Sequence, residues 1–297
     1  MAQPLLTRLK QGGATIDLLA PEWVAPVARR MPEVSAVIGA PFRHGPLQLR
    51  ERWRVARELG RRGYDQAFVL PNTWKSALVP FLARIPRRVG YLGEARYGLL
   101  NSIHRGAEAP MPLHYARLAG PLGDDLLPQP KLKVTESEVD EAKRRFGVGG
   151  RYVALCPGAE YGPAKRWPYF RELAEQLGRP AVLLGSAKDA QTGADVPGLN
   201  LLGRTTLDDA IRLIAVADAV VSNDSGLMHV AAALGRPQVA LFGSSSPEHT
   251  PPASGKARVL WLRLECSPCF SRECPLGHFR CMREIGVQKV LAALEGS

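Results

Sequence analysis

Short apolar runs alternate with amphipathic stretches along most of the chain. Strands are predicted at 14–19, 34–38, 66–70, 152–156, 181–186, 219–221 and 238–242. Helices are predicted at 4–10, 22–30, 47–62, 77–83, 136–146, 169–177, 208–216, 227–234 and 287–294. Regular alternation of strand and helix is typical of an α/β fold built on parallel sheets. The pattern therefore predicts doubly wound, Rossmann-like architecture.

The alternation is interrupted once, near residues 127–133. Pro121 precedes this segment, Pro128 and Pro130 lie within it, and the composition changes across it. A chain of 297 residues is long enough for two domains. We expect one α/β domain over residues 1–130 and a second over 131–297.

The most informative stretch runs from residue 219 to residue 252. A β-branched strand breaks into the polar turn 222–226 and then into a helix of small residues. The next strand, 238–242, leads into the hydroxyl-rich loop 243–250. Adjacent parallel strands deliver both loops to one sheet edge, where open α/β folds bind ligands. Asp224 or Ser225 can cap the helix, Gly226 permits close approach of an anion to its first N–H groups, and His229 lies about one and a half turns on.

The net charge of +11 comes mostly from arginine. It favours a polyanionic partner, which is a nucleic acid, an anionic membrane surface or a phosphorylated substrate. The alternative is that these cations lie on solvated helix faces. The sequence shows no apolar run of 18 residues and no signal peptide, so we expect a cytoplasmic protein. A P-loop, a dinucleotide-binding fingerprint, a metalloprotease helix and a nucleophile elbow are also absent from it.

Residues 223–233, NDSGLMHVAAA, followed by Leu241-Phe242-Gly243, resemble the nucleotide-sugar loop of the lipopolysaccharide heptosyltransferases, glycosyltransferase family 9. The alternative is an ordinary strand, cap and helix. The resemblance implies two doubly wound domains of glycosyltransferase-B type, with residues 1–130 on the acceptor side and 131–297 binding ADP-heptose. It also implies an inverting, metal-independent transfer of heptose to the first heptose of the inner core on Kdo-lipid A, with no cofactor.

The same resemblance assigns roles to individual residues. Lys165, shortly before a Trp-Pro pair, takes the place of the lysine that contacts the donor diphosphate. Thr205 and Thr206 lie where family members line the adenosine pocket, although either can cap the following helix. Because a carboxylate repels a diphosphate, Asp224 is assigned to hydroxyls or to N–H groups of its own loop. The backbone N–H groups of Ser225 and Gly226 are left for the phosphates.

Four residues of the first half are candidates to meet the acceptor. Asn72 and Lys75 follow the strand 66–70, and Arg88 and Arg96 lie in the next segments. The alternative for the cations is that they are solvated surface charges. The expected partners are therefore ADP-heptose and an anionic Kdo-lipid A glycolipid at the inner face of the cytoplasmic membrane, without nucleic acid. The protein is expected to be peripheral to that membrane.

The beginning of the chain departs from the family pattern. Heptosyltransferases begin with an apolar strand and a glycine-containing loop that carries an aspartate, the base proposed for the acceptor hydroxyl. Residues 1–6 match the helix that follows this loop. The base is therefore expected upstream of Met1, because of a mis-assigned start or a truncation, and no catalytic residue is assigned. Activity of the chain as written stays open.

Two alternative functions remain. One is a heptosyltransferase with another core acceptor. The other is a non-catalytic protein that binds a nucleotide or a nucleic acid, which the basic charge and the helix-turn pattern of 227–237 also permit.

Clustered cysteines mark the last part of the chain, at positions 266, 269, 274 and 281. In a cytosolic protein such clustering suggests a metal before a disulfide, and four thiolates within sixteen residues suit structural zinc, with His278 as a possible substitute ligand. The alternatives are reduced thiols or an incidental disulfide. The transfer reaction of the resembled family needs no metal, so no catalytic metal site is assigned.

Overall fold

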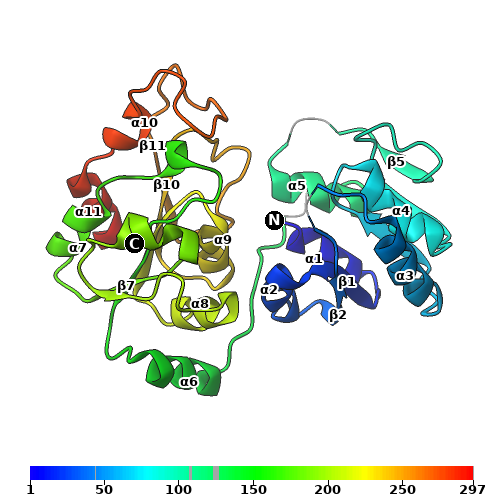
Figure 1. The fold of residues 1–297 in the computed structure, drawn as a ribbon, viewed down its shortest axis with the longest axis horizontal. Coiled ribbons are helices and arrows are strands. Elements are labelled where there is room, and N and C mark those ends of the chain that lie inside the picture. The colour runs from blue at the N-terminus through cyan, green and yellow to red at the C-terminus, as the bar shows by residue number, and fades with distance from the viewer. Residues whose placement is uncertain (44, 107–108, 123–126, 297) are drawn as a thin grey trace. The chain divides into compact units, whose positions relative to one another are not determined.

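The computed structural model describes residues 1–43, 45–106, 109–122 and 127–296, which fold into two compact units (Figure 1). Unit 1 comprises Met1–Arg29 and Glu33–Pro128, and unit 2 comprises Arg30–Pro32 and Gln129–Ser297. The division after Pro128 falls within the proline-containing segment 127–133. Of the helices in the described ranges, none has the length and apolar character needed to span a bilayer.

Unit 1 alternates helices and strands, as the pattern predicts. Its elements are α1 (Gln3–Gln11), β1 (Ile16–Pro21), η1 (Glu22–Val24), α2 (Ala25–Arg29), β2 (Val34–Ala40), α3 (Leu49–Gly60), β3 (Gln66–Val69), α4 (Trp74–Leu82), β4 (Arg87–Tyr91), β5 (Ser102–His104), α5 (Met111–Ala116) and η2 (Arg117–Ala119). The strand pairs described in this unit, β1-β2, β3-β4 and β4-β5, are parallel. The α/β class predicted from the alternation is confirmed.

The described strands of unit 1 form two sheets, β1-β2 and β3-β4-β5, rather than one. The two sheets nevertheless share helices. Val55 of α3 and Val79 of α4 belong to one apolar cluster that also contacts Leu19 of β1 and Ala67 of β3. In a second apolar cluster, Leu5 of α1 packs with residues of β3, β4 and η2. Helices therefore hold together strands that have no ladder between them.

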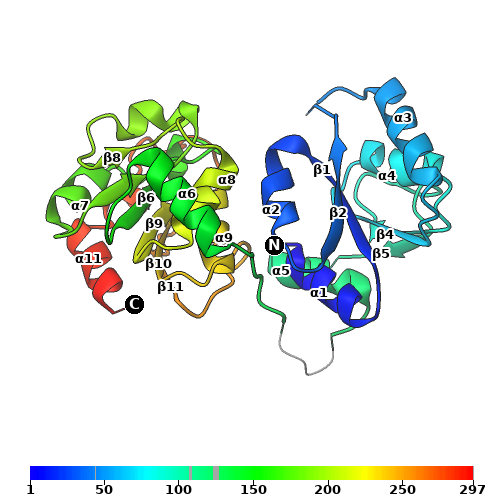
Figure 2. The same cartoon turned by 90° about the horizontal axis from the view of Figure 1, so that it is seen from below.

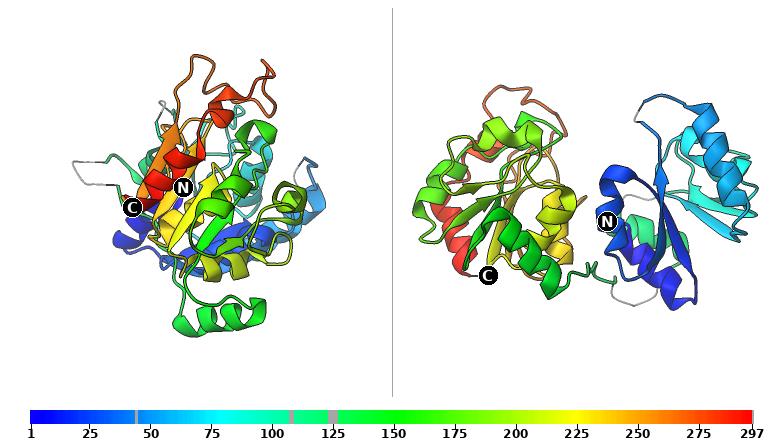
Figure 3. Two further views of the ribbon diagram at one scale, coloured as in Figure 1. Left: turned by 90° about the vertical axis from the view of Figure 1, so that its left-hand side faces the viewer. Right: turned by 60° about the horizontal axis from the view of Figure 1, so that its bottom comes forward.

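Unit 2 contains a single six-stranded parallel sheet with helices on both faces. Its elements are α6 (Glu136–Phe146), β6 (Val153–Cys156), η3 (Pro163–Lys165), α7 (Phe170–Gln176), β7 (Ala181–Leu183), η4 (Ala187–Gly193), β8 (Leu199–Asn200), α8 (Leu207–Ile214), β9 (Ala219–Asn223), α9 (Gly226–Ala233), β10 (Gln238–Phe242), β11 (Ala257–Trp261), α10 (Arg280–Arg283) and α11 (Val287–Glu295). Figure 3 shows this sheet and its helices in two further views. The sequence pattern did not predict β8, β11 or α10.

The strand order in unit 2 is β8-β7-β6-β9-β10-β11. The chain therefore builds outward from β6 in one direction, returns, and builds outward from β9 in the other, which is the doubly wound arrangement. β6 joins the two halves of the sheet through its pairing with both β7 and β9. In unit 1, none of the described strands joins the β1-β2 sheet to the β3-β4-β5 sheet in the way that β6 joins the two halves of the unit 2 sheet.

Successive residues of the central strands are buried on opposite faces of the sheet. Val239 and Leu241 of β10 pack in the large cluster that includes α7 and α11, whereas Ala240 and Phe242 pack against Met228 of α9. Figure 2 shows α7 and α11 on one side of this sheet and α8 and α9 on the other. Coverage of both faces explains why these strands are continuous apolar runs rather than alternating ones.

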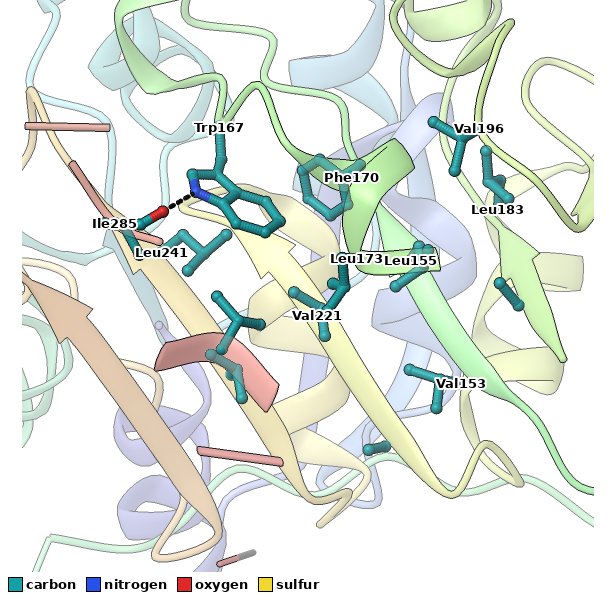
Figure 4. Packing of buried hydrophobic residues seen from close by; sticks show 14 of the residues in the cluster. Val153, Leu155, Trp167, Phe170, Leu173, Leu183, Val196, Val221, Leu241 and Ile285 are labelled. Carbon is teal, nitrogen blue, oxygen red and sulfur yellow. Dashed lines mark hydrogen bonds between the residues drawn. The ribbon is translucent and has the colours of Figure 1, made fainter. Parts of the chain in front are cut away.

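Trp167 anchors the long loop after β6 in the larger cluster. Its side chain is 1% exposed and packs edge-on against Phe170, with ring centroids 5.1 Å apart. Its indole Nε1 donates to the Ile285 carbonyl at 2.7 Å (Figure 4). A buried indole that satisfies its only donor fixes both the position and the rotation of the ring.

Substitution Trp167→Phe is expected to lower the free energy of unfolding of unit 2 by about 1–3 kcal/mol, because the Ile285 carbonyl loses this donor and the smaller ring leaves space in the cluster. The measurement is urea unfolding followed by circular dichroism. Trp53→Phe is the matched control, since Trp53 is 55% exposed, and it should leave the midpoints unchanged. Equal midpoints for Trp167→Phe and wild type would exclude the anchoring role.

Candidate functional site

The loops after β6 and β9 meet where the order of the unit 2 sheet reverses. β6 and β9 are hydrogen-bonded neighbours, with Cys156 paired to Ser222 at their carboxyl ends. The chain leaves β6 toward β7 on one side and leaves β9 toward β10 on the other, so the two loops diverge from the strand ends. Open α/β sheets bind ligands at such a reversal. Lys165 and Asp224 lie in these two loops.

Lys165 and Asp224 form an ion pair, with Nζ 2.5 Å from Oδ2. The Lys165 side chain is 15% exposed and that of Asp224 is 7% exposed. Ser245, in the loop after β10, donates its hydroxyl to the same carboxylate oxygen at 2.6 Å. Lys165 Nζ also lies 4.9 Å from the centroid of the Tyr161 ring. Three loops, from β6, β9 and β10, are thus joined through one carboxylate.

Asn223 holds the two ends of the Lys165 loop. It is fully buried, its Oδ1 accepts from the Trp167 backbone N–H at 3.1 Å, and its Nδ2 donates to the Pro157 carbonyl at 2.8 Å. The loop between these anchors is therefore fixed relative to β9. Asn223 and Ser245 were not among the predicted site residues. The buried polar residue at the end of an apolar strand was the signal for Asn223.

The start of α9 presents small polar residues. Ser225 is the N-cap and makes no side-chain capping bond, but its hydroxyl lies 3.1 Å from that of Ser222. Asp224 does not cap the helix either, because its carboxylate is held by Lys165 and Ser245. A side chain at Gly226 would meet no atom within 4 Å, and Gly226 is exposed. The first N–H groups of α9 are therefore open to an anion.

His229 lies on the first turns of the same helix. It is half-buried, and burial lowers its pKa to about 4. Its imidazole is therefore neutral at pH 7 and offers a hydrogen bond rather than a positive charge.

Thr205 and Thr206 precede α8. Thr206 caps this helix in a capping box with Asp209, in which its Oγ1 accepts from the Asp209 backbone N–H at 3.1 Å. Its own backbone N–H donates to Asp209 Oδ2 at 3.0 Å. Its hydroxyl therefore serves the helix, which was the alternative for this residue. Thr205 is half-buried, and its role in an adenosine pocket stays a prediction.

The four residues predicted to meet an acceptor differ in their surroundings. Asn72 is exposed, and Lys75 is half-buried with its Nζ donating to the Gly45 carbonyl at 2.7 Å. Arg88 donates to the Leu99 and Ile85 carbonyls, each at 2.7 Å.

Arg96 is 1% exposed and donates to several backbone carbonyls, among them that of Pro71 at 2.6 Å. Its guanidinium faces the interior of unit 1, so the expected contact with an acceptor does not fit this geometry. Arg96 instead holds the loop that carries Asn72 and Thr73, and its guanidinium also donates to the Thr73 carbonyl.

The cysteine-containing segment 266–281 covers part of the Lys165 and Ser245 loops. The Phe270 N–H donates to the Ser244 carbonyl at 2.7 Å, and the Arg272 carbonyl accepts from the Ala164 N–H at 3.0 Å. Tyr161, whose ring lies beside Lys165, donates its hydroxyl to the Phe270 carbonyl at 2.5 Å. This segment therefore supports the site from outside the sheet.

The family model for glycosyltransferase family 9 (heptosyltransferase) matches residues 52–280, which is more than half of the chain. The chain is 44% identical to lipopolysaccharide heptosyltransferase 2 of Escherichia coli K12 over 309 aligned residues, covering 95% of this chain and 89% of that protein. It is 42% identical to lipooligosaccharide heptosyltransferase 2 of Haemophilus influenzae, covering 86% and 82%.

Solved structures agree with these sequence relatives. The E. coli ADP-heptose lps heptosyltransferase II superimposes with a TM-score of 0.88 at 40% identity, covering 99% of this chain and 93% of that one. The E. coli heptosyltransferase WaaC with ADP shares the fold, with a TM-score of 0.69 at 20% identity over 99% and 95% of the two chains. The α/β, glycosyltransferase-B type fold implied by the sequence is confirmed. The chain belongs to glycosyltransferase family 9, the heptosyltransferase family.

Proposed function

We propose that this chain transfers heptose from ADP-heptose to the heptosyl-Kdo-lipid A inner core of lipopolysaccharide. The observation that carries the proposal is the convergence of Lys165, Asp224 and Ser245 on the sheet reversal of unit 2, beside the open start of α9. The names of relatives that are 40% or more identical to this chain, including an ADP-heptose lps heptosyltransferase II, support heptose as the transferred group.

In this proposal the donor diphosphate lies between Lys165 and the first N–H groups of α9. An ammonium group has three N–H donors, and one of them meets Asp224 here. The helix N-terminus adds a partial positive charge and the N–H groups of Ser225 and Gly226. The Asp224 carboxylate repels phosphate oxygens. Its role is therefore to hold Lys165 at the strand ends and to accept hydrogen bonds from hydroxyl groups such as that of Ser245.

The same groups stabilise the leaving group. Negative charge develops on the departing ADP in the transition state, and fixed cationic and N–H donors stabilise it without reorganisation. We therefore propose a transfer that requires no divalent ion. Direct displacement by the acceptor hydroxyl inverts the anomeric carbon and needs a base to accept the hydroxyl proton. We assign no residue to that role.

The acceptor is proposed to meet unit 1. Asn72 and Lys75 lie after β3, at the carboxyl end of a parallel strand, where Asn72 is exposed and Lys75 is half-buried. An inner-core glycolipid carries carboxylates and phosphates, which a lysine can pair with.

A basic aromatic face on α3 supports placement at an anionic membrane. Its exposed residues include Leu49, Arg50, Trp53, Arg54, Arg57 and, after the helix, Arg61 and Arg62. Glu58 is exposed there too and pairs with Arg62 at 2.8 Å, so the other arginines carry the excess positive charge. The guanidinium of Arg57 lies 5.5 Å from the Trp53 ring centroid. Cations interleaved with an exposed tryptophan are typical of helices that bind the interface of an anionic bilayer. We propose that this face makes the protein peripheral to the membrane that holds its acceptor.

Substitution Lys165→Met is expected to weaken ADP binding roughly 10- to 100-fold, as loss of a hydrogen bond to a charged group predicts. Adenosine, which lacks the diphosphate, should bind both proteins equally. The measurement is calorimetric titration of ADP, ADP-heptose and adenosine. The matched control is Lys188→Met, because Lys188 also pairs with a carboxylate, that of Glu160, at an exposed position.

Unchanged ADP affinity in the Lys165→Met protein would remove this lysine from the donor site. Equal losses for ADP and adenosine would indicate a general disturbance of unit 2 instead of a lost phosphate contact. Because the variant leaves the Asp224 carboxylate without its cation, the melting temperature is recorded in parallel, and the isosteric Asp224→Asn change in the same chain should restore it.

Replacement of Arg54 and Arg57 by glutamine is expected to weaken binding to phosphatidylglycerol-containing vesicles roughly 30-fold, at about 1 kcal/mol for each cation. Co-sedimentation measures the bound fraction, with neutral phosphatidylcholine vesicles as a second arm. The control is the double change Lys143→Gln and Arg144→Gln on α6, which removes the same charge from unit 2. Equal losses for the two double variants would show that net charge alone, and not the α3 face, drives binding.

A further inference from the structure

Four cysteines of the 266–281 segment line one small cavity. Cys266, Cys269, Cys274 and Cys281 surround a volume of about 20 Å³, enough for one water molecule or one ion. All four thiols are free in the structure. Cys266, Cys269 and Cys274 come from the connection between β11 and α10, and Cys281 comes from α10 itself.

Contacts on both sides fix the position of this cavity. A Cβ at Gly243, directly after β10, would lie 2.4 Å from Met282 Sδ and 3.2 Å from Cys281 Sγ, so only glycine allows α10 to pack this closely. Ala164, beside Lys165, also lines the cavity. Ser244 also lines the cavity, and its buried Oγ has no hydrogen-bond partner among the described residues. A hydroxyl donor is thus left facing a group of sulfur atoms.

The turn that follows Cys274 holds its sulfur in place. The Phe279 N–H donates to Cys274 Sγ at 3.4 Å. Phe279 has a φ of 51°, a left-handed conformation that is uncommon for a bulky residue and persists where its surroundings require it. The backbone therefore fixes the Cys274 sulfur at the wall of the cavity.

His278 is engaged in the same turn. Its Nδ1 accepts from the Arg280 N–H at 3.0 Å and lies 3.9 Å from Cys274 Sγ. This bond orients the imidazole within the turn. We therefore leave His278 out of the ligand set, because the four thiols are a complete donor set by themselves.

We propose that Cys266, Cys269, Cys274 and Cys281 bind one zinc ion as a closed, structural tetrathiolate site. Four thiolates suit the tetrahedral preference of Zn²⁺, and the pair 266/269 has the two-residue spacing common in structural zinc sites. In the described part of the chain, no group of three or more His, Cys, Asp or Glu residues is already arranged to hold a metal. The proposal therefore requires the four thiols to reorient toward the cavity when the ion binds. Ser244 Oγ then donates to a coordinated sulfur.

The site has a structural consequence. The segment that it closes donates to the Ser244 carbonyl through Phe270 and accepts from Ala164 through Arg272. Zinc would fix this segment over the Lys165 loop without touching the ion pair. The inference concerns folding of the segment and stands whether or not the proposed transfer reaction is right.

Elemental analysis of the full chain, purified without added chelator, is expected to find about one zinc per chain. After removal of metal, titration with Co²⁺ should give thiolate-to-cobalt charge-transfer bands that saturate at about one equivalent, and Zn²⁺ should displace them and raise the melting temperature. Cys281→Ser should lose the stoichiometric metal. His278→Ala and Cys156→Ala should keep it, since Cys156 is buried in β6 away from this segment.

The cobalt titration uses the unaltered chain, so it decides the question even if Cys281→Ser fails to fold. Folded protein that contains no zinc and gives no stoichiometric cobalt bands would overturn the proposal. Disulfides among these cysteines in freshly purified protein would overturn it too, as would loss of the metal in His278→Ala.

Discussion

Lys165 and Asp224 place opposite charges 2.5 Å apart at the two strand ends where the order of the unit 2 sheet reverses. Breaking a fully buried pair of this kind costs about 3–5 kcal/mol, because one charge stays uncompensated, and the cost is less where a partner keeps some exposure, as Lys165 does. The pair therefore constrains both loops. A ligand that binds here must offer negative charge to Lys165 while leaving Asp224 neutralised.

The surrounding structure holds this pair in place. Trp167 anchors the Lys165 loop in the apolar cluster, and Asn223 ties both ends of that loop to β9. The Asp224 N–H continues the ladder by donating to the Leu241 carbonyl at 3.0 Å, so the carboxylate follows directly from the register of β9 against β10. Rigid strands thus determine the position of a flexible lysine, which is the arrangement that electrostatic catalysis requires.

Local sequence patterns predicted the parts of this fold that local physics determines. The apolar run 238–242 is β10, and the charged helix 136–146 with its terminal glycine is α6, ended by Gly147 at a φ of 66°. The polar turn after β9 was predicted over 222–226, which is too long, because Ser222 and Asn223 complete β9 and Gly226 begins α9. Patterns could not predict contacts between distant side chains, such as Ser245 with Asp224. They also did not distinguish Arg96, which is held by buried carbonyls, from a surface cation, because that difference depends on tertiary packing. Likewise, the alternation predicted a parallel sheet in unit 1 but not its division into two.

The most direct test of the account is heptose transfer by the 297-residue chain. ADP release from ADP-heptose would be followed with heptosyl-Kdo-lipid A, with Kdo-lipid A lacking heptose, and without acceptor, using wild type and Lys165→Met. The account predicts release that depends on the heptosyl acceptor and falls in the variant. Equal release with the heptose-free acceptor would contradict the proposed acceptor. Saturable ADP-heptose binding without transfer to either acceptor would contradict the proposed activity and leave a nucleotide-binding protein.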